Sequence, residues 1–155
     1  MTRMLSASDV QTLLNMSDTI DTLEVAFSEF EKGTTRIPMR TPIDIESTNG
    51  LVLFMPSYVG GANALGSKAV SVFKDNPAKY NKNTISGTIT LIDDDNGDTL
   101  AILDAGYLTG MRTGGVAGLA TKHLSNEDSK IHTLFGLGGM AAAHAYACLL
   151  YTSPS

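Results

Sequence analysis

The stretch of sequence that decides the fold is IHTLFGLGGMAAAHAYA, residues 131–147. Its β-rich run Ile131–Phe135 predicts a short buried strand, and the alanine-rich run from Ala141 predicts the start of a helix. The turn between them matches the pattern Gly-x-Gly-x-x-Ala. In that pattern the first glycine, Gly136, permits a tight turn, and the second, Gly138, lets the backbone approach a pyrophosphate at the helix N-terminus. The motif alone fits a dinucleotide site and an ordinary glycine turn of an α/β protein equally well.

Upstream of this stretch, residues 40–104 contain short β-rich runs separated by turn signals. Asn49-Gly50 is the signature of a two-residue hairpin, and Asp95–Asp98 is a second tight turn between two runs. Strands joined by such turns run antiparallel, so we expect a largely antiparallel sheet. The expected strands are Thr41–Glu46, Leu51–Met55, Leu65–Phe73, Ile85–Ile92 and Thr99–Leu103.

Helical patterns lie on both sides of these runs. Ser8 and Gln11 have the spacing of a capping box, and a second apolar-periodic run follows Ser17 and ends at Gly33. The segment Tyr107–Leu124 returns to helical spacing and carries an unusual number of glycines. Since a glycine inside a helix costs about 1 kcal/mol relative to alanine, we expect another element to pack very close to this helix.

Together these patterns predict an α/β protein with two domains and a tail. Residues 1–124 form a mixed, largely antiparallel sheet domain with helices, and residues 125–147 begin a Rossmann dinucleotide-binding domain that is truncated. The acidic residue that would hold the ribose is expected about 20 residues after the glycine turn, beyond the last residue of the chain. Residues 148–155 resemble one reading frame of a sequencing-library adapter, so we expect a non-native tail that includes Cys148.

Composition narrows the classes of function. The formal net charge is −5, the pI is near 5.0, and no stretch concentrates Lys and Arg, which argues against a nucleic-acid or anionic-membrane partner. The apolar runs fall far short of the roughly 20 residues that span a bilayer, and the N-terminus has no signal-peptide pattern, so a cytoplasmic protein is the default expectation. One cysteine excludes an internal disulfide and a Cys-based metal site. The three histidines show no ligand spacing, so we expect no metal.

Three cationic residues are candidates for binding an anion. Strand alternation places Lys68 on the same face as Val70, and helical spacing places Arg112 on a core-facing stripe with Leu119. Arg40 lies at the mouth of the sheet. Buried cations are rare unless paired, and a substrate carboxylate suits an arginine fork. For any one of these residues alone, an internal salt bridge or a snorkelling side chain explains the position better, but the three together favour a carboxylate site.

A series of short motifs follows in order along the chain: Pro38-Met39-Arg40, Met55-Pro56, Leu65-Gly66-Ser67-Lys68, Asn76, Ile92-Asp93, Asn96-Gly97, Leu108-Thr109-Gly110-Met111-Arg112-Thr113 and Gly136-Leu137-Gly138-Gly139-Met140. In order and spacing this series resembles the ornithine cyclodeaminase and mu-crystallin family. The resemblance runs from the first helix to about Ala147. Its most specific pieces are the Gly-x-Lys strand and the Leu-Thr-x-x-Arg-Thr start of a helix.

The resemblance implies an N-terminal sheet domain that binds the substrate and forms a homodimer, and a Rossmann domain that binds NAD or NADP. The residues expected to grip the substrate carboxylate, with Lys68 also expected to be catalytic, are Arg40, Lys68 and Arg112. The residues expected to line the cofactor, from the resemblance and the glycine turn, are Thr84, Thr113, Gly136, Gly138, Gly139 and Met140.

The resemblance also implies an NAD(P)-dependent reaction at the α-carbon and nitrogen of a small amino or imino acid. Members of the family convert ornithine to proline by cyclodeamination, dehydrogenate amino acids such as alanine, or reduce ketimines. Leu53 stands where dedicated ornithine enzymes carry an acidic residue, and the aspartate expected to act on the substrate amine lies outside this chain. We expect ornithine cyclodeamination or amino-acid dehydrogenation; the alternatives are a ketimine or imine reductase, or a mu-crystallin-like protein that binds NAD(P) and a ligand without catalysis. We expect the chain by itself to be inactive.

Overall fold

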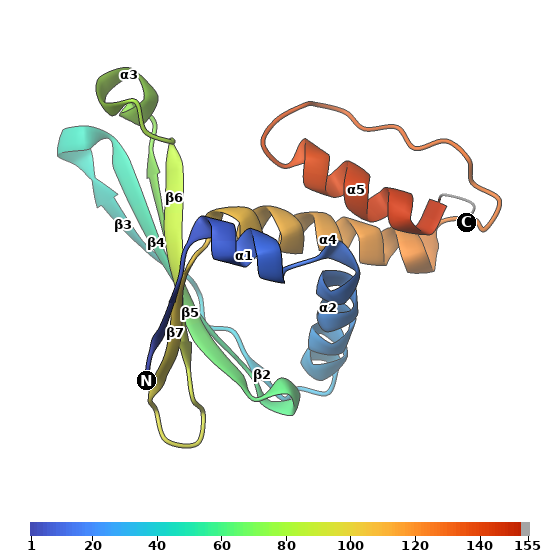
Figure 1. Cartoon of the computed structure of the whole chain (residues 1–155), viewed down its shortest axis with the longest axis horizontal. Helices are drawn as coiled ribbons and strands as arrows, with labels where there is room; N and C mark the ends of the chain where they lie inside the picture. Colours follow the sequence, from blue (N-terminus) through green and yellow to red (C-terminus); the bar gives the residue numbers. More distant parts are fainter. Residues whose placement is uncertain (153–155) are drawn as a thin grey trace.

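One seven-stranded sheet organises the chain (Figure 1). The computed structural model describes residues 1–152, with side chains up to residue 150. The strands are β1 (Arg3–Leu5), β2 (Thr35–Arg36), β3 (Thr41–Ile45), β4 (Gly50–Val59), β5 (Ala64–Phe73), β6 (Ile85–Ile92) and β7 (Thr99–Asp104). Their order is β1-β7-β6-β5-β4-β2, and β3 also pairs with β4. Among the described strands only β1 and β7 run parallel, so the predicted, largely antiparallel sheet is confirmed.

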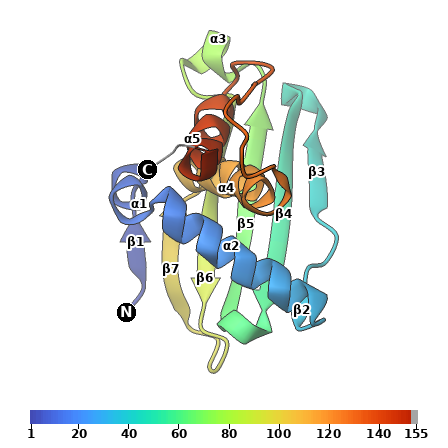
Figure 2. The same cartoon turned by 90° about the vertical axis from the view of Figure 1, so that its right-hand side faces the viewer.

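Helices cover one face of this sheet, and within residues 1–152 no helix covers the other face (Figures 1 and 2). We call these faces the helix side and the open side. The helices are α1 (Ala7–Leu13), α2 (Met16–Glu31), α3 (Asn76–Tyr80), α4 (Gly106–Leu124) and α5 (Ala141–Thr152). The short helix α3 stands at one end of the sheet, between β5 and β6, and the other four lie on the helix side (Figure 1).

The core consists of two clusters on the helix side. In one, Val10 of α1 packs against Ala101 and Leu103 of β7, with Ile89 of β6 beside them. This cluster attaches the N-terminus to the sheet. In the other, the three helices α2, α4 and α5 meet one another, and the buried residues are Met16, Ile20, Met111, Leu119 and Ala147.

The glycines of α4 allow close packing, as their number predicted. A Cβ atom at Gly118 would lie 2.9 Å from the Cβ of Ala147, and a Cβ atom at Gly114 would collide with the backbone of Ala143. Both alanines belong to α5. Larger side chains on α4 would therefore separate the two helices, and much of the second cluster would lose its contacts.

The predicted end of α2 is confirmed, whereas the predicted N-terminal cap of α1 is not. Gly33 ends α2 with a φ of +73°, the left-handed conformation that favours glycine after a helix. The predicted capping box of Ser8 and Gln11 is wrong. Ser6 and Asp9 form it instead: the Ser6 amide donates to the Asp9 carboxylate at 2.8 Å, and Ser6 Oγ accepts from the Asp9 amide at 3.3 Å. A carboxylate near a helix N-terminus also interacts favourably with the helix dipole, which favours this pair over a glutamine.

The predicted buried strand Ile131–Phe135 is absent. These residues belong to an irregular segment between α4 and α5, and the side chains of Ile131 and Phe135 are 88% and 94% exposed. A parallel strand requires neighbours that supply its backbone hydrogen bonds, and no described segment pairs with this one. The glycine turn and the helix after it are present, because a helix forms its hydrogen bonds within its own segment.

The helix α5 continues past the predicted end of the native sequence at Ala147. Its residue Cys148 is buried, and the thiol lies 3.3 Å from the hydroxyl of Thr121 on α4. The expected non-native tail, residues 148–155, thus falls partly on this helix and partly on residues 153–155, which lie outside the described residues. It stays a prediction.

Candidate functional site

Lys68 points to the helix side of the sheet, as strand alternation predicted. The register sets Leu103 opposite Ile89, Ile89 opposite Lys68, and Lys68 opposite Met55. Residues directly opposite one another in an antiparallel pair share a face. Because Leu103 and Ile89 pack against Val10 of α1, the whole row faces the helices.

Lys68 and Arg112 form an uncompensated pair of positive charges. Partial burial lowers the pKa of the Lys68 ammonium below its usual value, and repulsion from Arg112 lowers it further. Within the residues whose side chains are described, neither the ammonium nor the guanidinium group makes a hydrogen bond or an ion pair. Two neighbouring cations without a counter-ion attract an anion, and the planar guanidinium suits a carboxylate in particular.

Arg112 is nevertheless exposed, which corrects the prediction that it lies on a core-facing stripe. The prediction of a core-facing position is correct for Leu119, which is buried. The buried side of α4, however, centres on Met111 and Gly115. At 3.6 residues per turn, Arg112 lies about 100° around the helix from Met111, at the margin of that side. Arg112 is therefore open to solvent, close enough to Lys68 to repel its charge, and accessible to an incoming ligand.

Arg40 lies just before β3, and its side chain is exposed. The register of β3 sets Thr41 opposite Phe54. If this register is extended by one residue before β3, Arg40 lies opposite Met55, which is opposite Lys68 on the next strand. The backbone thus places Arg40 at the β3 end of this row.

A pocket of about 560 Å³ brings three of the predicted cofactor residues together. Thr84 lines it from the position just before β6, and Gly139 and Met140 line it from the residues just before α5. Val70 contributes from β5, two residues from Lys68 and on the same face. The pocket and the cation pair therefore adjoin along one strand.

The remaining predicted cofactor residues lie nearby but do not line this pocket. Thr113 is on α4, and its hydroxyl donates to the carbonyl of Thr109 at 2.7 Å. Gly136 adopts a φ of +94°, as the tight turn requires, and the Gly138 carbonyl accepts a hydrogen bond from the Ala141 amide at 3.0 Å.

Sequence reasoning missed the other residues that line the pocket, among them Val70, Asn83 and Thr109. Two of them adjoin predicted positions: Asn83 precedes Thr84, and Thr109 lies one helical turn before Thr113. Helical periodicity around Thr113 could have found Thr109, because residues four apart share a face.

Neither a metal site nor a membrane span is found in the described part of the chain. No group of three or more His, Cys, Asp and Glu side chains there could hold a metal ion. Among the described helices, none combines the length and apolar character needed to cross a bilayer.

Comparison with known proteins identifies relatives of the whole chain. The family model described as the ornithine cyclodeaminase/mu-crystallin family matches residues 1–153. A Δ1-pyrroline-2-carboxylate reductase of Bacillus cereus is 38% identical over 143 residues, which are 92% of this chain and 44% of that protein.

Two solved structures are also similar. The Thermococcus litoralis Δ1-pyrroline-2-carboxylate reductase in complex with NADH and L-proline is 37% identical, with a TM-score of 0.89 over 97% of this chain and 46% of that one. An archaeal alanine dehydrogenase dimer with bound NAD is 27% identical, with a TM-score of 0.89 over 97% of this chain and 45% of that one. The chain thus spans less than half the length of these relatives.

Proposed function

The chain belongs to the ornithine cyclodeaminase/mu-crystallin family, and from this premise we propose that the whole protein is an NAD(P)-dependent enzyme acting on a small amino or imino acid. In this proposal residues 1–124 bind the substrate and form the dimer. Residues 125–147 begin the Rossmann domain that binds the cofactor. The chain alone holds only part of such a domain and is inactive.

The observation that carries the proposal is the uncompensated pair of Lys68 and Arg112. A substrate carboxylate between them would supply the missing negative charge and accept the guanidinium fork, with Arg40 approaching from the end of the same row. Lys68 would also lie against the reacting part of the substrate. Its lowered pKa weakens the hold on its proton, which suits a residue that assists proton transfer.

The pocket beside Val70 fits the nicotinamide end of NAD or NADP. Gly139 and Met140 line it directly before α5, a 12-residue helix whose free amides favour a phosphate. Thr84 lines the same pocket. The relative from Thermococcus litoralis binds NADH together with L-proline. A bound nicotinamide would supply hydride transfer, while the protein holds the carboxylate at Lys68 and Arg112, next to that pocket.

The walls of the site favour a substrate without a second charged amine. On the helix side of β4, β5 and β6 no residue is acidic, and Lys68 is surrounded by Met55, Ile89 and Val70, with Leu53 opposite Val70. An ornithine or lysine side chain would leave its ammonium group without a counter-ion there. We therefore favour reduction of a small cyclic imino acid such as Δ1-pyrroline-2-carboxylate, the substrate after which two of the relatives are named.

Two other activities remain candidates. Lyase chemistry on ornithine would need an acidic group from the part of the protein outside this chain. A non-catalytic mu-crystallin-like protein would use the same cation pair to hold a ligand. For each of these candidate functions we propose that the protein is located in the cytoplasm.

The open side of the sheet is the proposed homodimer surface. Its apolar side chains are accessible, with Phe54 of β4 40% exposed and Ile43 of β3 50% exposed. The archaeal alanine dehydrogenase with the same fold is a dimer. Burial of this face against a second copy would remove apolar area from water and would cover the sheet.

The test is an assay of the whole protein with matched substrates. We expect NADH or NADPH oxidation with Δ1-pyrroline-2-carboxylate to exceed NAD⁺ reduction with L-ornithine or L-alanine. Lys68→Met should abolish turnover, whereas Lys74→Met, an exposed lysine six residues away, should not. Tight NADH binding without turnover on any of the three substrates would instead support the binding role. Full turnover by Lys68→Met would refute the site.

A further inference from the structure

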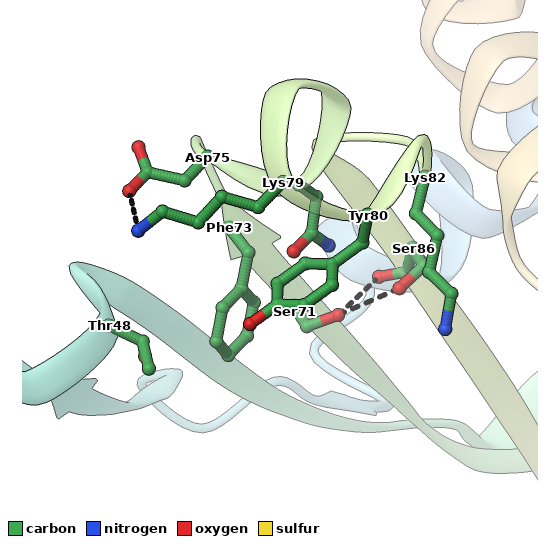
Figure 3. A pocket seen from close by; sticks show the side chains of 9 residues that line it. Thr48, Ser71, Phe73, Asp75, Lys79, Tyr80, Lys82 and Ser86 are labelled. Carbon is green, nitrogen blue, oxygen red and sulfur yellow. Dashed lines mark hydrogen bonds and ion pairs between the residues drawn. The ribbon is translucent and has the colours of Figure 1, made fainter.

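The loop of residues 81–84 joins the short helix α3 to β6 at one end of the sheet (Figure 3). It begins with Asn81, whose φ of 51° reverses the chain after the helix. Figure 3 shows Lys82 of this loop and Tyr80 of α3, which both line a pocket beside the helix. Residues 82–84 belong to no helix or strand, so individual hydrogen bonds decide how the loop lies.

The end of this loop lines the candidate cofactor pocket. Asn83 and Thr84 line that pocket together with the next three residues, 85–87. Thr84 is the predicted cofactor residue of the loop. Its hydroxyl makes no hydrogen bond within the residues whose side chains are described, so it can donate to a ligand in the pocket.

Asn76, the first residue of α3, makes three hydrogen bonds to the loop. Its backbone carbonyl accepts from the amide of Asn81 and, at 3.3 Å, from the amide of Lys82. Its side chain supplies the third bond, from Nδ2 to the carbonyl of Asn83 at 3.2 Å. The first two bonds use backbone atoms that every residue has, whereas the third requires a donor at the end of a side chain of this length.

The peptide units on both sides of Thr84 are fixed. The unit between Asn83 and Thr84 is held by Asn76 through the Asn83 carbonyl. The unit between Thr84 and Ile85 is held through the Thr84 carbonyl, which accepts from the amide of Phe73 at 2.8 Å. Because each unit is planar, fixing both sets the φ and ψ of Thr84 and hence the direction of its side chain. The bond from Phe73 uses backbone atoms alone, so Asn76 is the side chain on which this direction depends.

We propose that Asn76 is a positioning residue for the cofactor site, which directs the Thr84 hydroxyl towards the nicotinamide end of NAD or NADP. The inference rests on the proposed function, because it takes the pocket at Thr84 to be the cofactor site. Asn76 does not line that pocket and acts through the peptide unit that it holds. Without its side-chain bond the loop would populate other conformations, which would lower the apparent affinity for the cofactor.

Two substitutions of Asn76 test the role of its donor. Asn76→Ala removes the bond to Asn83 and keeps the bonds to the backbone carbonyl, in a helical position that alanine favours. We expect it to weaken NADH binding by the whole protein about 2- to 10-fold, the scale of one neutral hydrogen bond. Asn76→Asp keeps the shape but sets a carboxylate against the Asn83 carbonyl, and because neither group carries a proton, it should weaken NADH binding at least as much.

Asn81→Asp is the matched control. It adds the same charge to the same loop, and the side chain of Asn81 makes no hydrogen bond within the residues whose side chains are described. Aspartate tolerates the left-handed conformation of this residue. We expect its Kd for NADH to change less than about 2-fold, because solvent and salt screen an exposed charge. Fluorescence titration with NADH measures all the variants. Equal weakening by Asn76→Asp and Asn81→Asp, with none in Asn76→Ala, would assign the effect to charge and overturn the proposal.

A double-mutant cycle with Thr84→Ala tests whether Asn76 acts through Thr84. In the Thr84→Ala background, Asn76→Ala should leave the Kd for NADH nearly unchanged, because the hydroxyl that it positions is gone. The KM for the imino acid should stay nearly the same in every variant, because Lys68 and Arg112 hold that substrate. Additive effects of the two substitutions, or a lowered Tm with an unchanged Kd for NADH, would show that Asn76 only stabilises the fold and would overturn the inference. Failure of the unmodified whole protein to bind NADH would contradict the proposed function itself, and the inference with it.

Discussion

Replacing Lys68 with methionine should raise the free energy of unfolding of the chain. Lys68 is a partly buried cation that lies near Arg112 and has no counter-ion among the described side chains, so folding places it in a less favourable environment than water. Methionine keeps much of the length of the side chain, removes the charge and fits the neighbouring Met55 and Ile89.

The size of the effect follows from the partial exposure of the site. Solvent screens both the desolvation and the repulsion, so the gain should be about 0.5 to 1 kcal/mol, the scale of a single ionic interaction at an accessible position. For a chain of this size that corresponds to a rise in Tm of roughly 1 to 4 °C. Scanning calorimetry at pH 7 on the unmodified chain and on the variant resolves such a difference. Lys74→Met is the control, because this exposed lysine lies outside the site.

The stability difference between Lys68→Met and the unmodified chain should also depend on pH. The pKa of Lys68 in the folded chain lies below its ordinary value of 10.5, so the folded state releases this proton at a lower pH than the unfolded state. Below the folded-state pKa, the charged Lys68 lowers the free energy of unfolding by its full amount. As the pH rises from that pKa to 10.5, this destabilisation disappears, because the unfolded state binds more protons in that interval. The stability difference between Lys68→Met and the unmodified chain should therefore shrink as the pH approaches 10.5. A variant that is less stable at pH 7, or a difference that grows with pH, would refute the uncompensated pair.

Three further predictions concern the helices and the site. Arg112→Lys keeps the charge but loses the planar fork, so kcat/KM of the whole protein should fall by roughly 30- to 1,000-fold, or about 2 to 4 kcal/mol. The Kd for NADH should stay nearly unchanged. A loss of thermal stability with intact kinetics would assign Arg112 a structural role. Gly114→Val would push the backbone of Ala143 away, so the free energy of unfolding in urea should fall by about 1 to 3 kcal/mol, and an unchanged midpoint would show that α5 is not held by this contact. Glu29 accepts hydrogen bonds from Lys32 and Thr34, which lower its pKa below 4.5; Glu29→Gln should therefore destabilise the chain at pH 7, and the difference in Tm should vanish as the pH falls through that lowered pKa rather than persist in acid.

Features that depend on neighbouring residues could be predicted from the sequence. Asn49-Gly50 marked the place of the turn between β3 and β4, and Asn49 has a φ of 49°, the left-handed conformation that asparagine tolerates. The predicted two-residue hairpin is wrong, because Gly50 already pairs with Ile45 and the loop consists of the four residues 46–49. The face of Lys68 followed from alternation alone, because the side chains of a strand alternate with a period of two. The glycines of α4 correctly indicated a close neighbour.

Features that depend on distant residues could not be predicted in the same way. The helical period placed Arg112 on the buried side of α4, whereas it lies about 100° from that side, the rotation of a single residue. The positions of α2 and α5, which the period does not contain, decide where the buried side ends. The composition of Ile131–Phe135 is that of a strand, yet strand formation requires partners that the described chain does not supply. The pocket formed by Thr84, Gly139 and Met140 joins segments that are far apart in the sequence, and the family resemblance was the only signal for Thr84.

The parallel pairing of β1 with β7 makes the order of synthesis matter. The hydroxyl of Thr2 donates to the carbonyl of Thr99, so one edge of the sheet is completed by contacts across 97 residues of sequence. At ribosomal rates of about 5 to 20 residues per second, β1 must wait roughly 5 to 20 s for its partner to be made. During that time the apolar Met4 and Leu5 have no strand to pair with, and the nascent chain exposes a segment that chaperones can bind. An extension placed directly before Met1 would act on this late step of folding rather than on the site itself.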